Sequence, residues 1–357
     1  MSVCRLHFRS CIFLVSLASA FLFGCSDPGA SRCIEEALPE GALPTGKGGV
    51  RVLATPDDSY SVHDADGRQL ESAAANKLID LAPGRYLLKI NHATHPVTVR
   101  AGRLLTCSTG FLVVNADSDA NFYVLDEAGA PLALSRLGRP LALFEGPYQV
   151  RLNNTSTPVQ VTAGVTAEVQ AGLLTVQGAT GQIFYVHEPG GRQLGYTKLN
   201  EALALLPGAY EVRLNGSVWP AQVRATETTW IESGTLVVKG EAPGEFAVHA
   251  TEGRQVAAAP LSSPLALFPG SWIVKVNNSA AEAPLQPSET VELATGILLV
   301  QGEAGRSFPV LDAAGAEIAV SESGAPLALL PGRYTLKSGS DSRTVTINAG
   351  AVTRFRP

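Results

Sequence analysis

The sequence lacks the short motifs by which common catalytic and metal sites are recognised. Its 357 residues contain no GxSxG, no HExxH, no CxxC pair and no phosphate-binding loop. Cysteine (5), histidine (6) and tryptophan (3) are scarce. These absences predict a protein that is not an enzyme and that holds no metal and no cofactor.

Positive charge is also in short supply. The net charge of −5 becomes −7 once Arg5 and Arg9 leave with residues 1–24, which contain no acidic residue. We therefore expect no nucleic-acid partner, because nucleic acid attracts basic surfaces. No long helical period is present either, whereas glycine (35) and proline (23) recur between short apolar runs. That pattern predicts many turns joining many strands.

Segment 1–24 has the composition of an export signal. Arg5 and Arg9 precede an almost wholly apolar run at 11–23, which is too short to span a bilayer, since a spanning helix needs about 20 residues. Leu22-Phe23-Gly24-Cys25 resembles a bacterial lipobox. The resemblance implies cleavage before Cys25 and diacylation of its thiol. It therefore implies a protein of the cell envelope that is attached to the membrane through this lipid anchor. An ordinary signal peptide cut nearby is the alternative.

The residue after the lipobox cysteine bears on the choice of membrane. Ser26 stands where the inner-membrane retention signal of enterobacteria has aspartate. We therefore expect lipid anchoring at the outer membrane rather than at the inner membrane.

Two cysteines, Cys33 and Cys107, remain after Cys4 and Cys11 leave with the signal and Cys25 takes lipid. In an oxidising compartment this pair predicts a Cys33–Cys107 disulfide. The alternative is that Cys107 is only a small buried hydrophobe. Its counterparts in the repeats described next are all apolar: Val169, Ile231, Leu293 and Phe355.

One pattern occurs five times at an interval of 62 residues, without a gap. It aligns one aromatic position, namely Tyr86, Tyr148, Tyr210, Trp272 and Tyr334. We number the repeats 1 to 5, and they span 49–110, 111–172, 173–234, 235–296 and 297–357. Residues 25–48 would be the lipidated cysteine and a flexible tether. Repetition at this period predicts a tandem array of small units.

Each unit has the pattern of six or seven short strands with no room for a helix. Pro207-Gly208 predicts a type II turn in which the glycine has a positive φ. The strand that follows alternates, with Tyr210, Val212 and Leu214 on the core face. The pair Asn215-Gly216 then predicts a two-residue hairpin turn.

The segment "LLPGAYEVRL" resembles the "L.PG.Y.V.V" signature of transthyretin-like or PEGA-like β-sandwich modules of bacterial envelope proteins. The resemblance covers the second half of each repeat, and implies binding or spacer modules rather than enzymes. The fold class is therefore all-β, with five small β-sandwich repeats in an elongated array. The alternative is a five-bladed β-propeller, although propeller blades usually have about 40 to 50 residues.

Repeat 3 alone has tryptophan at two positions where its siblings have small or polar residues. Trp219 and Trp230 are therefore the candidate surface for an unknown envelope protein or glycan, and burial against a neighbouring repeat is the alternative.

Three repeats carry a histidine and an arginine together, as His63 with Arg68, His187 with Arg192, and His249 with Arg254. They are interpreted as one repeated polar site or as inherited hairpin residues.

A column of basic residues is expected on the outward face of the strand that follows the turn glycine of each repeat. Its members are Lys89, Arg151, Arg213, Lys275 and Lys337. The column could bind along an anionic polymer or protect a strand face from pairing with another edge.

Together the patterns predict a lipid-anchored, non-catalytic scaffold or binding module that projects from the membrane. The alternatives are a purely structural spacer or assembly subunit and a carbohydrate-binding propeller.

Overall fold

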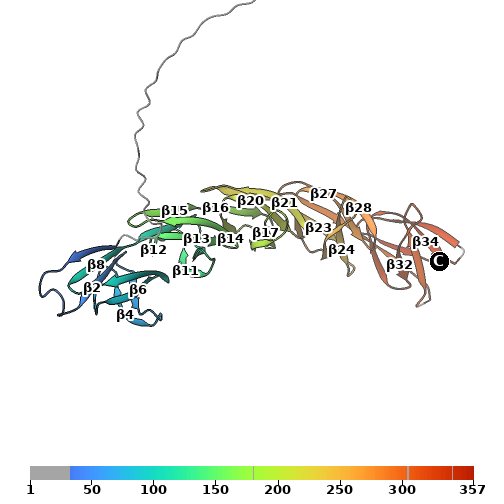
Figure 1. Cartoon of the computed structure of the whole chain (residues 1–357). Helices are drawn as coiled ribbons and strands as arrows, with labels where there is room; N and C mark the ends of the chain where they lie inside the picture. The colour runs from blue at the N-terminus through green and yellow to red at the C-terminus, as the bar shows by residue number, and fades with distance from the viewer. Residues whose placement is uncertain (1–32, 180, 304, 340) are drawn as a thin grey trace, which may run out of the picture.

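The computed structural model describes residues 33–179, 181–303, 305–339 and 341–357. Within these ranges the regular elements are β-strands, and their small sheets follow one another in a row along the molecule (Figure 1). None of the sheets in these ranges closes into a ring of blades. The fold is therefore the predicted elongated array of all-β sandwiches, and the propeller alternative is wrong. In the same ranges no helix is long and apolar enough to cross a membrane.

Each repeat contains seven strands, and one further strand, β1 (Cys33–Ala37), precedes them. Repeat 1 has β2 (Gly48–Leu53), β3 (Ser59–His63), β4 (Gln69–Ala74), β5 (Leu78–Leu81), β6 (Gly84–Ile90), β7 (Ala93–Val99) and β8 (Arg103–Ser108). Repeat 2 has β9 (Gly110–Asn115), β10 (Asn121–Leu125), β11 (Pro131–Arg136), β12 (Leu141–Leu143), β13 (Gly146–Leu152), β14 (Thr155–Val161) and β15 (Thr166–Gln170). Repeat 3 has β16 (Gly172–Gln177), β17 (Ile183–His187), β18 (Gln193–Lys198), β19 (Ala202–Leu205), β20 (Gly208–Leu214), β21 (Ser217–Val223) and β22 (Thr228–Glu232). Repeat 4 has β23 (Gly234–Lys239), β24 (Glu245–Ala250), β25 (Gln255–Pro260), β26 (Leu265–Leu267), β27 (Gly270–Val276), β28 (Ser279–Leu285) and β29 (Thr290–Ala294). Repeat 5 has β30 (Gly296–Val300), β31 (Ser307–Leu311), β32 (Glu317–Glu322), β33 (Pro326–Leu329), β34 (Gly332–Ser338), β35 (Asp341–Ile347) and β36 (Val352–Phe355).

The seven strands of a repeat form two sheets. In repeat 3, β16 lies between an antiparallel β19 and a parallel β22, with Leu174 opposite Leu203 on one side and Thr229 on the other. The remaining strands form an antiparallel sheet in the order β18-β17-β20-β21. The other repeats have the same two sheets, and in repeat 1 the strand β1 is added to the first of them.

The core lies between the two sheets and continues across the joints between repeats. Tyr210, Val212 and Leu214 are buried, as the alternation in β20 predicts. Phe268 of repeat 4 belongs to the same apolar cluster as Leu214 of repeat 3. Because neighbouring units share buried apolar surface, each sandwich contributes to the stability of the next.

The turn before β20 differs from the prediction. Gly208 is not among the residues with a positive φ, so the predicted type II geometry is wrong. The ring of Tyr210 lies over Gly208 instead, with its hydroxyl 3.4 Å from where a Cβ would be, and that hydroxyl donates to the Leu206 backbone oxygen at 2.5 Å. A Cβ at Gly208 would touch this ring at ordinary van der Waals distance, so neither a positive φ nor steric overlap requires glycine at this position.

The same contact across the turn recurs in every repeat. The aromatic side chain donates to the carbonyl oxygen four residues before it. The pairs are Tyr86 with Ala82 (2.8 Å), Tyr148 with Phe144 (2.8 Å), Trp272 with Phe268 (3.2 Å) and Tyr334 with Leu330 (2.7 Å).

The first strand of each unit begins one residue before the repeat boundary given above, at a glycine. In repeat 3, which spans 173–234, this strand is β16 and it begins at Gly172. A Cβ on Gly172 would overlap the backbone oxygen of Arg224. This glycine is therefore required by a close approach of two backbone segments within its own sandwich.

Residues 33–48 are structured, so the flexible tether predicted for 25–48 is wrong over this range. Strand β1 pairs antiparallel with β8, and a disulfide joins Cys33 to Cys107. Ion pairs join Arg100 to Glu35 (2.6 Å) and Lys47 to Asp80 (2.5 Å). Sheet pairing and a covalent bond together hold this segment on repeat 1. Cys25, the predicted site of lipid attachment, lies outside the described residues.

Each joint between two repeats has one hydrogen bond in common. The first residue of the turn between the fifth and sixth strands is an asparagine with a positive φ, and its Nδ2 donates to a backbone oxygen of the next repeat. The pairs are Asn91 with Ala142 (3.0 Å), Asn153 with Ala204 (2.6 Å), Asn215 with Ala266 (2.9 Å) and Asn277 with Ala328 (2.9 Å). The predicted hairpin turn at Asn215-Gly216 is confirmed, since both residues have a positive φ.

Candidate binding surface

Trp219 lies at a joint between two repeats. It shares the inward side of β21 with Ser217 and Ala221, which are buried. Its ring lies 5.9 Å from the ring of Phe268 in repeat 4, measured between centroids, and 37% of the residue is exposed. His95 stands at the same position in repeat 1 and lies 5.3 Å from Phe144 of repeat 2. Trp219 therefore covers the joint between repeats 3 and 4 and exposes only part of its ring.

Trp230 lies on the outward face of β22. Its neighbour Ile231 is buried in the core, while Trp230 is 60% exposed. On β16 its cross-strand partner is Thr175. The two tryptophans thus belong to different sheets, Trp219 on the inward side of β21 and Trp230 on the outward face of β22, and no ring contact joins them among the described residues.

The counterparts of Trp230 in the other repeats are polar. They are Thr106, Glu168, Glu292 and Arg354. Glu168 accepts a hydrogen bond from Gln170 at 3.0 Å, and Glu292 pairs with Lys239 at 2.5 Å. Repeat 3 is therefore the one unit with a large exposed aromatic side chain at this position.

The histidine and arginine pairs serve the hairpin turns on which they lie. Nδ1 of His187 is 3.0 Å from the backbone oxygen of Gly191, so the imidazole donates across the turn. The same 3.0 Å contact joins His63 to Gly67 and His249 to Gly253. Arg192 pairs with Glu188 in the same turn, and this ion pair lowers the pKa of the Glu188 carboxyl. These contacts favour the hairpin interpretation over a repeated polar site.

The basic column is partly used by local contacts. Arg213 pairs with Glu211 on the same strand at 2.7 Å. The guanidinium of Arg151 lies 4.9 Å from the centre of the Tyr123 ring. Charge that is paired in this way offers a weak track for an anionic polymer.

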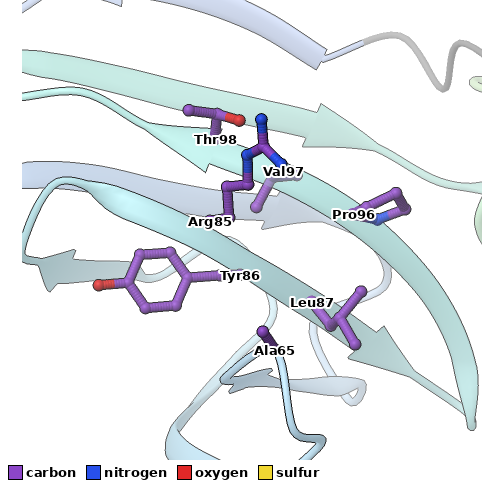
Figure 2. A pocket seen from close by; sticks show the side chains of 7 residues that line it. All are labelled: Ala65, Arg85, Tyr86, Leu87, Pro96, Val97 and Thr98. Atoms are coloured by element: carbon purple, nitrogen blue, oxygen red, sulfur yellow. The ribbon is translucent and has the colours of Figure 1, made fainter.

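A depression of about 450 Å³ lies on β6 and β7 of repeat 1. Figure 2 shows its side chains spread along β6 and β7, with Ala65 on the turn between β3 and β4, instead of converging on one point. The Tyr86 hydroxyl already donates to the Ala82 backbone oxygen at 2.8 Å. This surface has no set of convergent polar groups of the kind that a catalytic site needs.

The strongest pKa shifts belong to structural groups. Burial raises the pKa of Tyr148 and of Tyr210 to about 12, and each hydroxyl bonds a backbone oxygen four residues earlier, across the turn. Among the described residues, no group of three or more histidine, cysteine, aspartate and glutamate side chains is placed to hold a metal ion.

One feature was missed by reasoning from the sequence, namely that β22 is an edge strand of its sheet, opposite β19. Strand order depends on pairing between distant segments, which the alternation in one strand does not contain. The usable signal was the column of charged residues aligned with Trp230, because charge is typical of edge strands.

No protein-family model matches this sequence, and a search of curated proteins finds no match. Three solved structures show partial likeness. The Bacillus anthracis TIE protein is 12% identical with a TM-score of 0.18, covering 92% of this chain and 75% of that one. The pilus adhesin SpaC from Lactobacillus rhamnosus GG, in its open conformation, is 10% identical with a TM-score of 0.19, covering 91% and 56%. BcpA, the major pilin subunit of Bacillus cereus, is 8% identical with a TM-score of 0.14, covering 87% and 98%. TM-scores this low carry no argument about function.

Proposed function

We propose that this chain is a lipid-anchored protein of the bacterial cell envelope that displays five β-sandwiches as a stiff, non-catalytic binding scaffold. The lipobox at 22–25 supports the anchor, and Ser26 supports the outer membrane as its location. The units resemble transthyretin-like or PEGA-like modules in their "LLPGAYEVRL" segment, which also supports a binding or spacer role.

The observation that carries the proposal is the repeated joint. Each of the four joints has an asparagine amide bonded to the next repeat. At the last two joints a buried serine adds a second bond, because Ser217 accepts from the Phe268 amide (3.1 Å) and Ser279 from the Leu330 amide (2.9 Å). Joints that share both polar contacts and apolar core have little freedom to bend, so the array suits holding a surface at a set distance from the membrane.

The anchor is tested by metabolic labelling with radioactive palmitate. The wild-type chain should incorporate label and fractionate with membranes, whereas Cys25→Ser should do neither. Label retained by Cys25→Ser would contradict lipid attachment at this residue.

The stiff array is tested by solution scattering of the mature chain carrying Cys25→Ser. An elongated profile that shortens by one unit when residues 235–296 are deleted is the expected result. A profile that needs a broad range of bend angles would contradict the scaffold.

The variant Trp230→Ala separates a purely structural spacer from a binding scaffold. It should leave the length of the array unchanged, and it should weaken partner binding only if the array binds a partner.

A further inference from the structure

The seventh strand of each repeat lies at the edge of the three-stranded sheet. These strands are β15, β22, β29 and β36 in repeats 2 to 5, where no further described strand pairs with their outer edges. In repeat 1 the corresponding strand β8 is covered, because β1 is added along it in antiparallel register. The molecule therefore shows in repeat 1 that this edge accepts an extended segment as an additional strand.

The five edges are protected to different degrees. Repeat 1 is capped by β1, and repeats 2, 4 and 5 carry the exposed charges Glu168, Glu292 and Arg354 at the centre of the edge strand. Charge on an edge strand opposes pairing with another chain. Repeat 3 has no added strand and no charge at the centre of its edge strand, where Trp230 stands with 60% of its surface exposed. The charge on β22, Glu232, lies at the end of the strand. An exposed aromatic residue on an open edge favours pairing.

The β1 register indicates which residues a docked strand would meet on β22. In repeat 1, Ile34 lies opposite Thr106. The equivalent position two repeats later is Trp230, so the docked strand would place one side chain directly against the indole. Two residues earlier on the docked strand, a side chain on the same face would lie opposite the exposed Glu232.

We propose that the outer edge of β22 binds an extended polypeptide segment of a partner protein as an added antiparallel strand. An apolar side chain of the segment packs on Trp230, and a basic side chain pairs with Glu232. Backbone hydrogen bonds to the open edge supply the general affinity, and these two side chains supply selectivity for repeat 3. This inference rests on the proposed binding scaffold and names the chemical class of its partner.

The test uses the mature chain carrying Cys25→Ser and a fluorescein-labelled peptide of residues 31–38 carrying Cys33→Val. This peptide has Arg32 and Ile34 two positions apart, in the order that Glu232 and Trp230 require. The native disulfide keeps β1 on β8, so the labelled peptide reports on the open edges. Fluorescence anisotropy should show one peptide bound per chain.

Three variants separate the edge of β22 from other surfaces. Trp230→Glu copies the residue of repeats 2 and 4 and should weaken binding by at least about tenfold, as loss of an interface anchor does. Trp219→Ala should leave binding unchanged. The double change Glu168→Trp, Gln170→Glu should raise the stoichiometry to two, because it gives repeat 2 both side chains of the β22 edge. Equal affinity for Trp230→Glu and the wild type would overturn the proposal.

Strand addition is separated from side-chain contact by two peptides that are N-methylated on alternate residues. Only alternate backbone N–H groups of an added strand point toward β22. The peptide that is methylated on the N–H groups facing away from β22 should therefore bind, and the other peptide should not. If both bind or neither binds, the added strand is excluded. Oligomers of N-acetylglucosamine provide the remaining comparison. If the chain binds these oligomers through Trp230 and does not bind the peptide, this surface belongs to a glycan and the proposal is overturned. These assays need no lipid, so their failure is distinguishable from failure of the anchor.

Discussion

Nδ2 of Asn215 in repeat 3 lies 2.9 Å from the backbone oxygen of Ala266 in repeat 4. The asparagine has a φ of 47°, which turns its side chain out of the hairpin toward the neighbouring sandwich. One residue thus forms the turn of its own unit and bonds the next unit. Because the contact recurs at every joint, the joints can be altered one at a time without touching a core.

Asn277→Gly should remove the joint bond between repeats 4 and 5 while keeping the turn, since glycine accepts a positive φ. We expect a loss of about 1 kcal/mol in the free energy of unfolding, the usual net value of one hydrogen bond. Urea unfolding measures it. Asn200→Gly is the matched control, because the Asn200 amide bonds Gly178 within repeat 3. Both variants should be less stable, but only Asn277→Gly should broaden the scattering profile.

Gly216→Ala should disrupt the joint between repeats 3 and 4. A Cβ at Gly216 would overlap the backbone oxygen of Val256 in repeat 4, and the φ of 76° adds strain. Gly67→Ala has a similar φ of 83° but open space around the new methyl group, so it should cost only about 1 kcal/mol. Thermal melting of the two variants separates the steric effect from the backbone effect. Equal melting temperatures would contradict the close approach.

Alkaline pH should weaken the array through its turn tyrosines. In the folded chain burial raises the pKa of Tyr148 and of Tyr210 from 10.0 to about 12. The unfolded chain therefore loses these protons first, so stability is complete below pH 10 and falls as pH rises from 10 to 12. The double variant Tyr148→Phe, Tyr210→Phe should be less stable at neutral pH and should lose less stability over that range. Tyrosinate absorbance at each pH measures the raised pKa values, and urea unfolding at each pH measures the loss of stability.

Reduction of the Cys33–Cys107 disulfide should destabilise repeat 1 in particular. The bond closes a loop between residues 74 positions apart and holds β1 on β8, and a native disulfide commonly contributes about 2 to 4 kcal/mol. Hydrogen exchange should therefore accelerate in β8 and leave β22 unchanged. A mass increase of two hydrogens on reduction confirms the chemistry. Uniform acceleration in all five repeats would show that the bond stabilises the array as a whole.

The fold class followed from local patterns. The alternation of Tyr210, Val212 and Leu214 and the turn pair Asn215-Gly216 depend on neighbours within a few residues, and the 62-residue period follows from comparing the sequence with itself. Side-chain alternation of this kind separates the core face from the solvent face in any strand. For the same reason the surface exposure of Trp230 could be predicted from the buried parity of Ile231.

The turn at Gly208 shows where local reasoning was wrong. Proline followed by glycine is typical of a type II turn, but the fold places the ring of Tyr210 over this glycine and bonds its hydroxyl to Leu206. Packing of a buried aromatic side chain outweighed the usual preference of the dipeptide. Residues 33–48 show the same effect, since a polar, glycine-rich composition suggested a tether and pairing with β8 produced a strand.

The number of repeats followed from the 62-residue period, and the all-β character and the residues of the cores and hairpins followed from alternation over a few residues, so the sequence was sufficient for these features. Which strands became edges, which asparagine reached the next repeat and that Trp219 packs against Phe268 of repeat 4 were decided only by the tertiary structure. The reason is physical, since each of these outcomes depends on contacts between distant residues, such as the 51 positions that separate Asn215 from Ala266. Such contacts form only when two sandwiches are already packed together.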